Sequence, residues 1–181
     1  MRAFVGLPLP EPWIDPLLRA QSRLPGGRPV PEDDLHLTLA FLDDQTEDKL
    51  EALHDLLDAR RDKAAVLEPL AFAVFGAGRA RLVALDLRAT PDLSALRDGV
   101  RNAVRRAGID LPRERFRPHV TLLRYPASAP PEGDRLMRAL TGLGAPAITP
   151  APAPAVAMWT SRLTPSGPIY DQVATYPLVA A

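Results

Sequence analysis

The stretches His36-Leu37-Thr38-Leu39 and His119-Val120-Thr121-Leu122 repeat one four-residue pattern and hold two of the three histidines of the chain. Each lies in a short apolar run that predicts a β-strand. Residues two apart on a strand point to the same face, so each His shares a face with its Thr. The two copies stand 83 residues apart in a chain of 181. This spacing predicts two similar halves, related by a pseudo-twofold axis, whose motif strands face one ligand across a cleft.

Outside the two motifs, strand and helix patterns alternate along the chain. Apolar residues at helical spacing, with turn residues at the ends, predict helices over Pro12–Leu24, Thr46–Arg61, Thr90–Gly108 and Asp134–Leu143. Apolar or alternating runs predict strands over Phe4–Leu9, Leu35–Leu42, Leu70–Phe75, Arg81–Leu87, His119–Tyr125, Val156–Thr164 and Ile169–Tyr176. The Ala- and Pro-rich stretch 145–155 is a linker or an edge strand.

Length and composition set the class of protein. With 181 residues the chain can bury a core as one domain, or as two small lobes that share a core. There is no run of eighteen apolar residues, and Pro8 interrupts the N-terminal apolar run, so we expect neither a membrane span nor a secretory signal. The absence of Cys excludes disulfides and thiolate metal sites. We therefore expect a cytoplasmic protein.

Acidic and basic residues balance at 22 each, which argues against a protein that holds long nucleic acid by bulk electrostatics. Arg makes up 20 of the 22 basic residues, and eight of these arginines precede or surround the second motif. Arg97, Arg101 and Arg105 repeat every four residues, which predicts a solvated helix face. The arginines from Arg113 to Arg124 are better placed to meet an anion.

The paired motifs supply the groups needed to hydrolyse a phosphodiester by acid–base chemistry. The unperturbed pKa of imidazole lies near neutrality, so one His can act as base and the other as acid. In-line attack at phosphorus needs a base on the entering water and an acid on the leaving oxygen, on opposite sides of the phosphorus. The Thr hydroxyls can donate to the non-bridging phosphate oxygens. The motifs alone leave open which His is the acid.

Other interpretations of the histidines also stay open. A single His in an alternating strand is more often structural, and only the duplication of the pattern favours catalysis. His is a common metal ligand; Asp33 and Asp34 lie just before His36, but nothing similar flanks His119. His54 lies among the leucines of a predicted helix with no Thr two residues on, and we expect it at the edge of the core.

Four segments resemble the two-histidine phosphoesterase superfamily, and more narrowly the bacterial RNA 2′,3′-cyclic phosphodiesterases, long described as 2′-5′ RNA ligases. These segments are Arg2-Ala3-Phe4-Val5-Gly6-Leu7, Leu35-His36-Leu37-Thr38-Leu39-Ala40-Phe41-Leu42, Phe116-Arg117-Pro118-His119-Val120-Thr121-Leu122 and Ser161-Arg162-Leu163-Thr164-Pro165-Ser166-Gly167-Pro168-Ile169-Tyr170. The resemblance runs nearly end to end. It implies a bilobal α+β fold, a single domain over residues 1–181. Two pseudo-twofold-related lobes then line a central cleft with antiparallel sheets and keep their helices outside.

The resemblance also implies the roles of the site residues. His36 is the proton donor to the leaving 3′ oxygen and His119 is the proton acceptor that activates water, with no metal and no cofactor. Thr38 and Thr121 bind the phosphate. Arg124, five residues after His119, matches a position where the family often carries a phosphate-contacting Arg. Strict alternation puts Arg124 on the face opposite His119, so this role requires a bulge or a strand end there.

The chain also departs from the family pattern, which leaves the residue that stacks on the nucleobase open. Asp43 stands where the family often has Gly, and the strand Arg81-Leu82-Val83-Ala84-Leu85 lacks the bulky residue often found there. By alternation, Phe41 lies on the apolar face and is expected in the core. Tyr125 shares the face of His119 and is the candidate for base stacking.

The sequence thus predicts metal-independent hydrolysis of RNA 2′,3′-cyclic phosphate ends to 2′-phosphomonoesters, with 2′-5′ RNA ligation as a weak reverse activity. Two alternatives stay open. One is a phosphodiesterase for a small cyclic nucleotide or a 2′-5′ oligonucleotide, and the other is a non-catalytic module that binds nucleotides or RNA ends. The expected partners are RNA ends or short oligonucleotides that carry a 2′,3′-cyclic phosphate. We expect a monomer with no membrane contact and no obligate protein partner.

Overall fold

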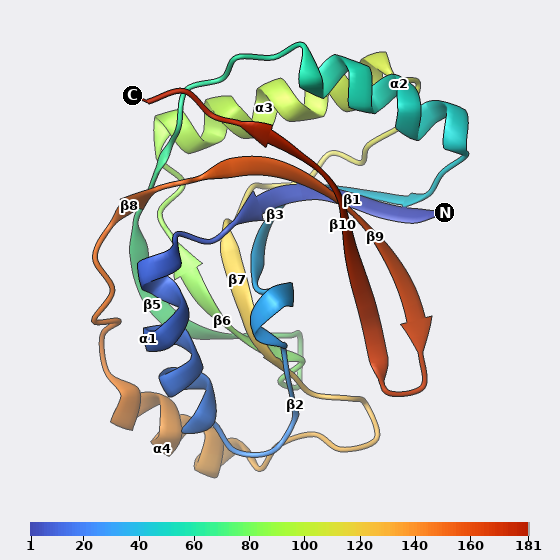
Figure 1. Ribbon diagram of the computed structural model, residues 1–181. Helices are drawn as coiled ribbons and strands as arrows, with labels where there is room; N and C mark the ends of the chain where they lie inside the picture. The colour runs from blue at the N-terminus through green and yellow to red at the C-terminus, as the bar shows by residue number, and fades with distance from the viewer. Residues whose placement is uncertain (181) are drawn as a thin grey trace.

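A long antiparallel sheet carries both motif strands, in a computed structural model that describes residues 1–180 (Figure 1). The strands are β1 (Arg2–Pro8), β2 (Arg28–Pro29), β3 (His36–Asp44), β4 (Val66–Leu67), β5 (Pro69–Phe75), β6 (Leu82–Leu87), β7 (His119–Arg124), β8 (Ala151–Pro152), β9 (Ala155–Thr164) and β10 (Gly167–Pro177). The helices are α1 (Glu11–Ser22), α2 (Glu47–Asp58), α3 (Pro91–Arg106), α4 (Gly133–Leu143) and the short 3-10 helix η1 (Glu32–Asp34). The main sheet runs β10-β9-β1-β3-β7-β6-β5, with β2 paired to β7. The predicted α+β class is confirmed.

The two motif strands meet at a single residue pair, Leu37 of β3 opposite Val120 of β7. Each of these residues directly follows the His of its motif, so antiparallel pairing here relates the two motifs by a local twofold axis. Both side chains are fully buried, at 0% exposure. Because neighbouring strand residues point to opposite faces, the His and Thr of each motif point away from the core.

The two lobes do not follow the two halves of the sequence. β3 pairs with β1, whose other edge takes the C-terminal strands β9 and β10, whereas β7 pairs with β6 and then β5 from the middle of the chain. The repeated units are β1-α1-β3 and β6-α3-β7, in each of which the two strands pair antiparallel. Each helix packs against a strand of the other unit, because α3 contacts β3 and α1 contacts β7. The prediction of two sequential halves is therefore wrong: the C-terminal hairpin pairs with the open edge of β1 and joins the first lobe.

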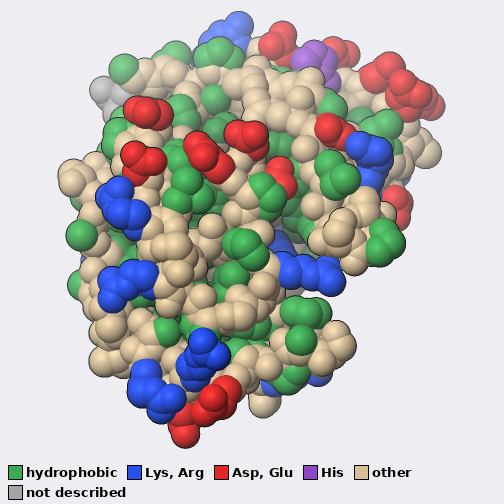
Figure 2. Space-filling view, turned by 60° about the horizontal axis from the view of Figure 1, so that its bottom comes forward, with side chains coloured by type: hydrophobic (Ala, Val, Ile, Leu, Met, Phe, Trp, Pro, Cys, Tyr) green, Lys and Arg blue, Asp and Glu red, His purple; other side chains and the backbone are tan. Residues whose placement is uncertain are grey.

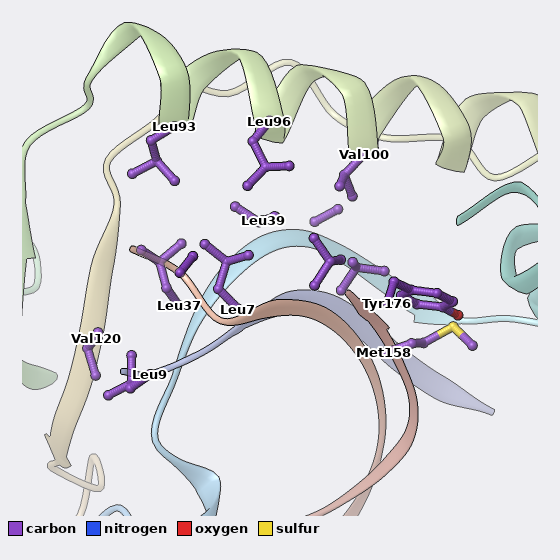
Figure 3. Packing of buried hydrophobic residues seen from close by; sticks show 14 of the residues in the cluster. Leu7, Leu9, Leu37, Leu39, Leu93, Leu96, Val100, Val120, Met158 and Tyr176 are labelled. Carbon is purple, nitrogen blue, oxygen red and sulfur yellow. The ribbon is translucent and has the colours of Figure 1, made fainter. Parts of the chain in front are cut away.

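The main core lies between α3 and the sheet face that the motif His and Thr side chains avoid. Leu93, Leu96 and Val100 of α3 point toward Leu37 and Leu39 of β3 (Figure 3). All five are at most 4% exposed, and full burial of such a side chain contributes about 1.5–3 kcal/mol. This packing fixes β3 from behind and so holds the motif side chains toward the other face.

The predicted helices and strands are all present, and their boundaries follow local chemistry. The Thr90 hydroxyl accepts from the backbone N–H of Leu93 at 3.2 Å and caps α3, with Pro91 in the first turn. The Ala- and Pro-rich stretch contains the short strand β8, in which Ala151 pairs with Leu67 of β4. Among residues 1–180, no helix is long and apolar enough to cross a membrane.

Candidate active site

A cavity of about 320 Å³ opens beside the point where β3 and β7 meet. Its lining residues are His36, Thr38, Leu39, Phe41, Leu82, Arg97, Glu114, Arg115, Phe116, Arg117, His119, Thr121, Arg124 and Tyr170. Five of the six predicted site residues therefore lie around one space, and only Tyr125 does not. In the space-filling view, basic side chains lie at a hollow in the surface, and acidic side chains gather on a separate part of it (Figure 2). This charge distribution suits an anionic ligand.

His36 is held from both sides by hydrogen bonds. Its Nδ1 lies 2.6 Å from the carbonyl oxygen of Asp34, and because a carbonyl only accepts, Nδ1 carries the proton. Its Nε2 lies 3.1 Å from the Thr38 hydroxyl. Its ring stacks on Phe4 with centroids 4.6 Å apart, and the ring of Tyr170 lies nearly perpendicular to it with centroids 5.5 Å apart. His36 is therefore a fixed imidazole against an aromatic wall, with Nε2 directed to the phosphate-binding hydroxyl predicted from the sequence.

This enclosure changes the protonation of His36. Burial lowers its pKa from 6.5 to about 4; the hydrogen bond to Asp34 opposes this shift, and the positive charge of Arg124 adds to it. Near pH 7 the imidazole of the free protein is therefore neutral. With the proton on Nδ1, the Nε2 lone pair accepts the hydrogen bond of the Thr38 hydroxyl.

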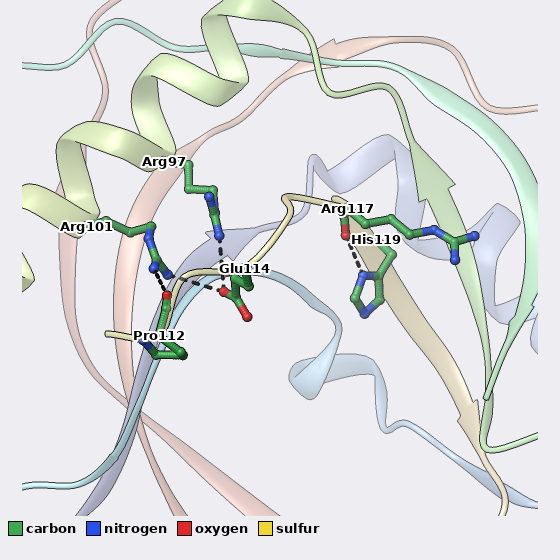
Figure 4. Close-up of polar contacts among 6 residues, drawn as sticks. All are labelled: Arg97, Arg101, Pro112, Glu114, Arg117 and His119. Atoms are coloured by element: carbon green, nitrogen blue, oxygen red, sulfur yellow. Dashed lines mark hydrogen bonds and ion pairs between the residues drawn. The ribbon is translucent and has the colours of Figure 1, made fainter. Parts of the chain in front are cut away.

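His119 repeats the anchoring of His36 in a different setting. Its Nδ1 donates to the carbonyl oxygen of Arg117 at 2.8 Å, again two residues upstream (Figure 4). Its ring lies beside Phe75, with centroids 4.6 Å apart. Both histidines thus use Nδ1 for the backbone and keep Nε2 for the cavity, which is the same ring orientation in both motifs.

A β-bulge in β7 decides which face carries Arg124. Opposite β6, the paired positions jump from Thr121 to Leu123, so Leu122 is the extra residue. Leu122 and Leu123 are both buried, and the next residue, Arg124, is exposed and lines the cavity. The bulge that the sequence required for Arg124 is therefore present, and the guanidinium shares a face with His119.

The same bulge turns Tyr125 away from the site. Tyr125 is 7% exposed and packs in a separate apolar cluster with Leu123. Its hydroxyl donates to the carbonyl oxygen of Pro25 at 2.7 Å, and burial raises the pKa of this hydroxyl. The predicted shared face of Tyr125 and His119 is wrong, because alternation was counted through the bulge.

β3 has a bulge at the equivalent place. Its pairing with β1 jumps from Thr38 to Ala40, so Leu39 is the extra residue. Phe41 is consequently 46% exposed and lines the cavity, and its predicted place in the core is wrong. Phe41 follows His36 by five residues, as Arg124 follows His119. The spacing of five from each His is the sequence signal that would have found Phe41.

Two arginines expected in solvent are buried instead. Arg97 and Arg101 of α3 are 7% and 3% exposed. Both donate to the Glu114 carboxylate, at 3.1 and 3.2 Å, and Arg101 also donates to the carbonyl oxygen of Pro112 (Figure 4). The Arg97 guanidinium lies over the Phe116 ring, 4.5 Å from its centroid. The predicted solvated face is wrong here, because these side chains hold the segment that leads into the second motif.

The other arginines around the second motif differ in how far they are exposed and paired. Arg105 is exposed, as expected. Arg117 pairs with Asp86 at 3.0 Å and lies 3.9 Å from the centroid of the Phe75 ring. Arg115 lines the cavity and is exposed. Among residues 1–180, no group of three or more His, Asp or Glu side chains comes close enough together to hold a metal ion.

Comparisons with known proteins identify the family of this chain. Residues 8–160 match the 2′-5′ RNA ligase superfamily. The RNA 2′,3′-cyclic phosphodiesterase of Thermus thermophilus is 32% identical over 195 residues, covering 98% of this chain and 90% of that relative. The protein of the same name from Geobacillus stearothermophilus is 28% identical over 188 residues, which cover 98% of this chain and 57% of that relative's length. Among solved structures, Escherichia coli LigT complexed with 3′-AMP has a TM-score of 0.69 and 26% identity, covering 98% of this chain and 97% of that one. This chain belongs to the 2′-5′ RNA ligase superfamily.

Proposed function

We propose that this chain hydrolyses the 2′,3′-cyclic phosphodiester ends of RNA to 2′-phosphomonoesters. The observation that carries the proposal is the equivalent anchoring of His36 and His119 through Nδ1 to the backbone two residues upstream. Each imidazole leaves Nε2 free of the backbone, in a cavity that also holds Thr38, Thr121 and Arg124, and in the free protein Nε2 of His36 accepts from the Thr38 hydroxyl. Support comes from relatives named for this activity and from LigT, which was solved with the nucleotide 3′-AMP.

In the proposed reaction the cyclic phosphate lies between the two imidazoles. His119 takes a proton from water, whose oxygen forms the new bond to phosphorus. The bond between phosphorus and the 3′ oxygen breaks, and His36 gives a proton to that oxygen. Thr38, Thr121 and Arg124 donate to the non-bridging oxygens, which hold the negative charge of the transition state. When a 5′-hydroxyl takes the place of water, it forms the new bond to phosphorus and the bond to the 3′ oxygen breaks, which joins two RNA ends through a 2′-5′ linkage as a weak activity at high concentrations of ends.

The proton-donor role requires a protonated His36 in the complex. In the free protein its pKa is lowered to about 4, by burial first and also by the charge of Arg124. A phosphodiester anion beside these two side chains opposes the charge of Arg124 and favours the imidazolium. We therefore propose that His36 takes up a proton when the substrate binds.

The proposal also covers the organisation and surroundings of the protein. We propose one bilobal domain over residues 1–181 that acts in the cytoplasm as a monomer, without a metal ion or cofactor. Its partners are RNA ends or short oligonucleotides with a 2′,3′-cyclic phosphate. The single cavity that both motifs line supports one substrate site per chain.

Hydrolysis of a cyclic-phosphate-ended oligonucleotide in the presence of EDTA tests the proposal. We expect conversion to the 2′-phosphomonoester, and a loss of about 10²–10⁴-fold in rate for His36→Ala and for His119→Ala. Thr38→Val should lose less, because it removes one hydrogen bond. His54→Ala is the matched control, since His54 is exposed on α2 and contacts Tyr176 rather than the cavity. A cyclic end that survives wild-type protein, while a related enzyme consumes it, would refute the proposal; activity lost only in EDTA would refute metal independence.

A further inference from the structure

A second cavity, of about 330 Å³, adjoins the first and plays no part in the mechanism above. It lies between β2, the end of β7 and the tip of the β9–β10 hairpin. Arg124 and Tyr170 line both cavities and so form the boundary between them. Arg28, Asp34 and Pro168 are among the residues that line only the second one.

The charges of this second cavity are unbalanced. Arg28 of β2 pairs directly with Arg124 of β7, so the two side chains leave the sheet on the same side as cross-strand neighbours. Like charges in this position are destabilising. Among residues 1–180, neither guanidinium forms an ion pair with a carboxylate. An anion that lies between the two arginines removes this repulsion.

The remaining walls suit a nucleoside. The proline rings of Pro29, Pro31, Pro126 and Pro168 give flat apolar surface, and Tyr170 gives an aromatic ring. The Ser166 hydroxyl and the Asp34 carboxyl add polar groups that can meet a ribose or a base edge. Apolar walls beside two guanidinium groups match a sugar and base attached to a phosphate.

The second cavity lies on the His36 side of the site. Its wall includes Asp34, whose carbonyl accepts from His36, and Tyr170, whose ring meets the His36 ring edge-on. In the proposed reaction His36 protonates the 3′ oxygen, which stays attached to the ribose of the RNA strand. The body of that strand therefore leaves the first cavity on this side.

We propose that the second cavity binds the penultimate nucleotide of the RNA, with the phosphate that joins the last two nucleotides at Arg28, while Arg124 lies at the boundary between this phosphate and the cyclic one. This inference rests on the proposed function and makes the enzyme selective for RNA ends over free 2′,3′-cyclic mononucleotides. A phosphate contact of this kind raises kcat/KM chiefly through KM, because it lies away from the reacting bonds.

The test compares kcat/KM for a 2′,3′-cyclic mononucleotide and for a dinucleotide with the same cyclic-phosphate end. Wild-type protein should prefer the dinucleotide about tenfold or more, the equivalent of about 1.4 kcal/mol. Arg28→Gln should remove most of this preference by raising KM for the dinucleotide, and Arg28→Glu should remove more of it. Arg28→Gln should leave kcat/KM for the mononucleotide unchanged, whereas the carboxylate of Arg28→Glu lies opposite Arg124 and can also affect the mononucleotide. Arg28 is exposed, so neither change removes buried packing.

Arg138→Gln is the matched control, because Arg138 is exposed on α4 and lines neither cavity. Equal kcat/KM for the two substrates in wild-type protein would overturn the inference while leaving the proposed function intact. A loss of kcat/KM in Arg28→Gln that is the same for both substrates would also overturn it. If wild-type protein turns over neither substrate, the proposed function itself has failed.

Discussion

Protonation of His36 should make the folded protein sensitive to acid in a range set by this one residue. Burial lowers the pKa of His36 from 6.5 to about 4 in the folded protein, whereas in the unfolded chain it returns to about 6.5. The unfolded state therefore binds a proton first as the pH falls. The contribution of neutral His36 to the free energy of unfolding is fully present above about pH 6.5 and is lost as the pH falls toward about 4. The two pKa values give a loss of about 2 kcal/mol at pH 5 and about 3 kcal/mol at pH 4.

Urea denaturation of wild-type protein and His36→Gln at several values between pH 7 and pH 4 measures this effect. Other titrating groups act on both proteins, so the quantity of interest is the difference in free energy of unfolding between them. Acid should change this difference by about 3 kcal/mol to the disadvantage of the wild type. His54→Gln removes an exposed imidazole and controls for the loss of a histidine as such. Parallel curves for wild type and His36→Gln would show that burial does not set the protonation of His36.

Three further substitutions test the local structure that supports the site, each by urea denaturation. Asp43 has a φ of +54°, so Asp43→Val should lower the free energy of unfolding by about 1–2 kcal/mol. Glycine adopts this φ without strain, so a lower free energy of unfolding for Asp43→Gly would contradict the reasoning. A Cβ on Gly6 would lie 2.5 Å from the carbonyl oxygen of Leu37; Gly6→Ala should cost about 1–3 kcal/mol and slow hydrolysis, and an unchanged rate would show that β3 tolerates the shift. Arg101→Met should cost about 1–3 kcal/mol, because it removes buried hydrogen bonds to Glu114 and to the backbone; no loss would mean that these bonds add nothing to stability.

The site could be predicted from the sequence as far as strand alternation holds, and no further. His36 and Thr38 line the cavity as alternation requires, because no extra residue intervenes between them. At the last residue of each motif the strand bulges, and the faces expected for Phe41 and Tyr125 were reversed. The doubled apolar step Leu122-Leu123 is the local sign of the bulge in β7, because an alternating strand has only one residue there that faces the core.

The buried arginines of α3 show a different limit of prediction. Spacing of four residues is the same for a solvated face and for a face that contacts a distant segment. What distinguishes them is Glu114, which accepts from Arg97 and Arg101 although it follows Arg101 by 13 residues. This contact depends on the path of the chain after the helix ends, and no local pattern in the sequence describes that path.

A local twofold axis relates the two motifs, but the surroundings of His36 and His119 differ. Together these two features suit the proposed roles of one His as acid and the other as base. The axis gives His36 and His119 the same backbone anchor, so each presents Nε2 to the cavity. The surroundings then differ. His36 lies against Phe4 and Tyr170, where burial lowers its pKa, whereas His119 lies beside the exposed Arg117 and its ion pair. In the proposed reaction, His36 is neutral in the free protein and becomes a charged proton donor only when the phosphate is bound. The proposed coupling depends on the aromatic rings that β1 and β10 place against His36, and these strands lie far from either motif in the sequence. The four-residue pattern alone therefore cannot predict which His is the acid.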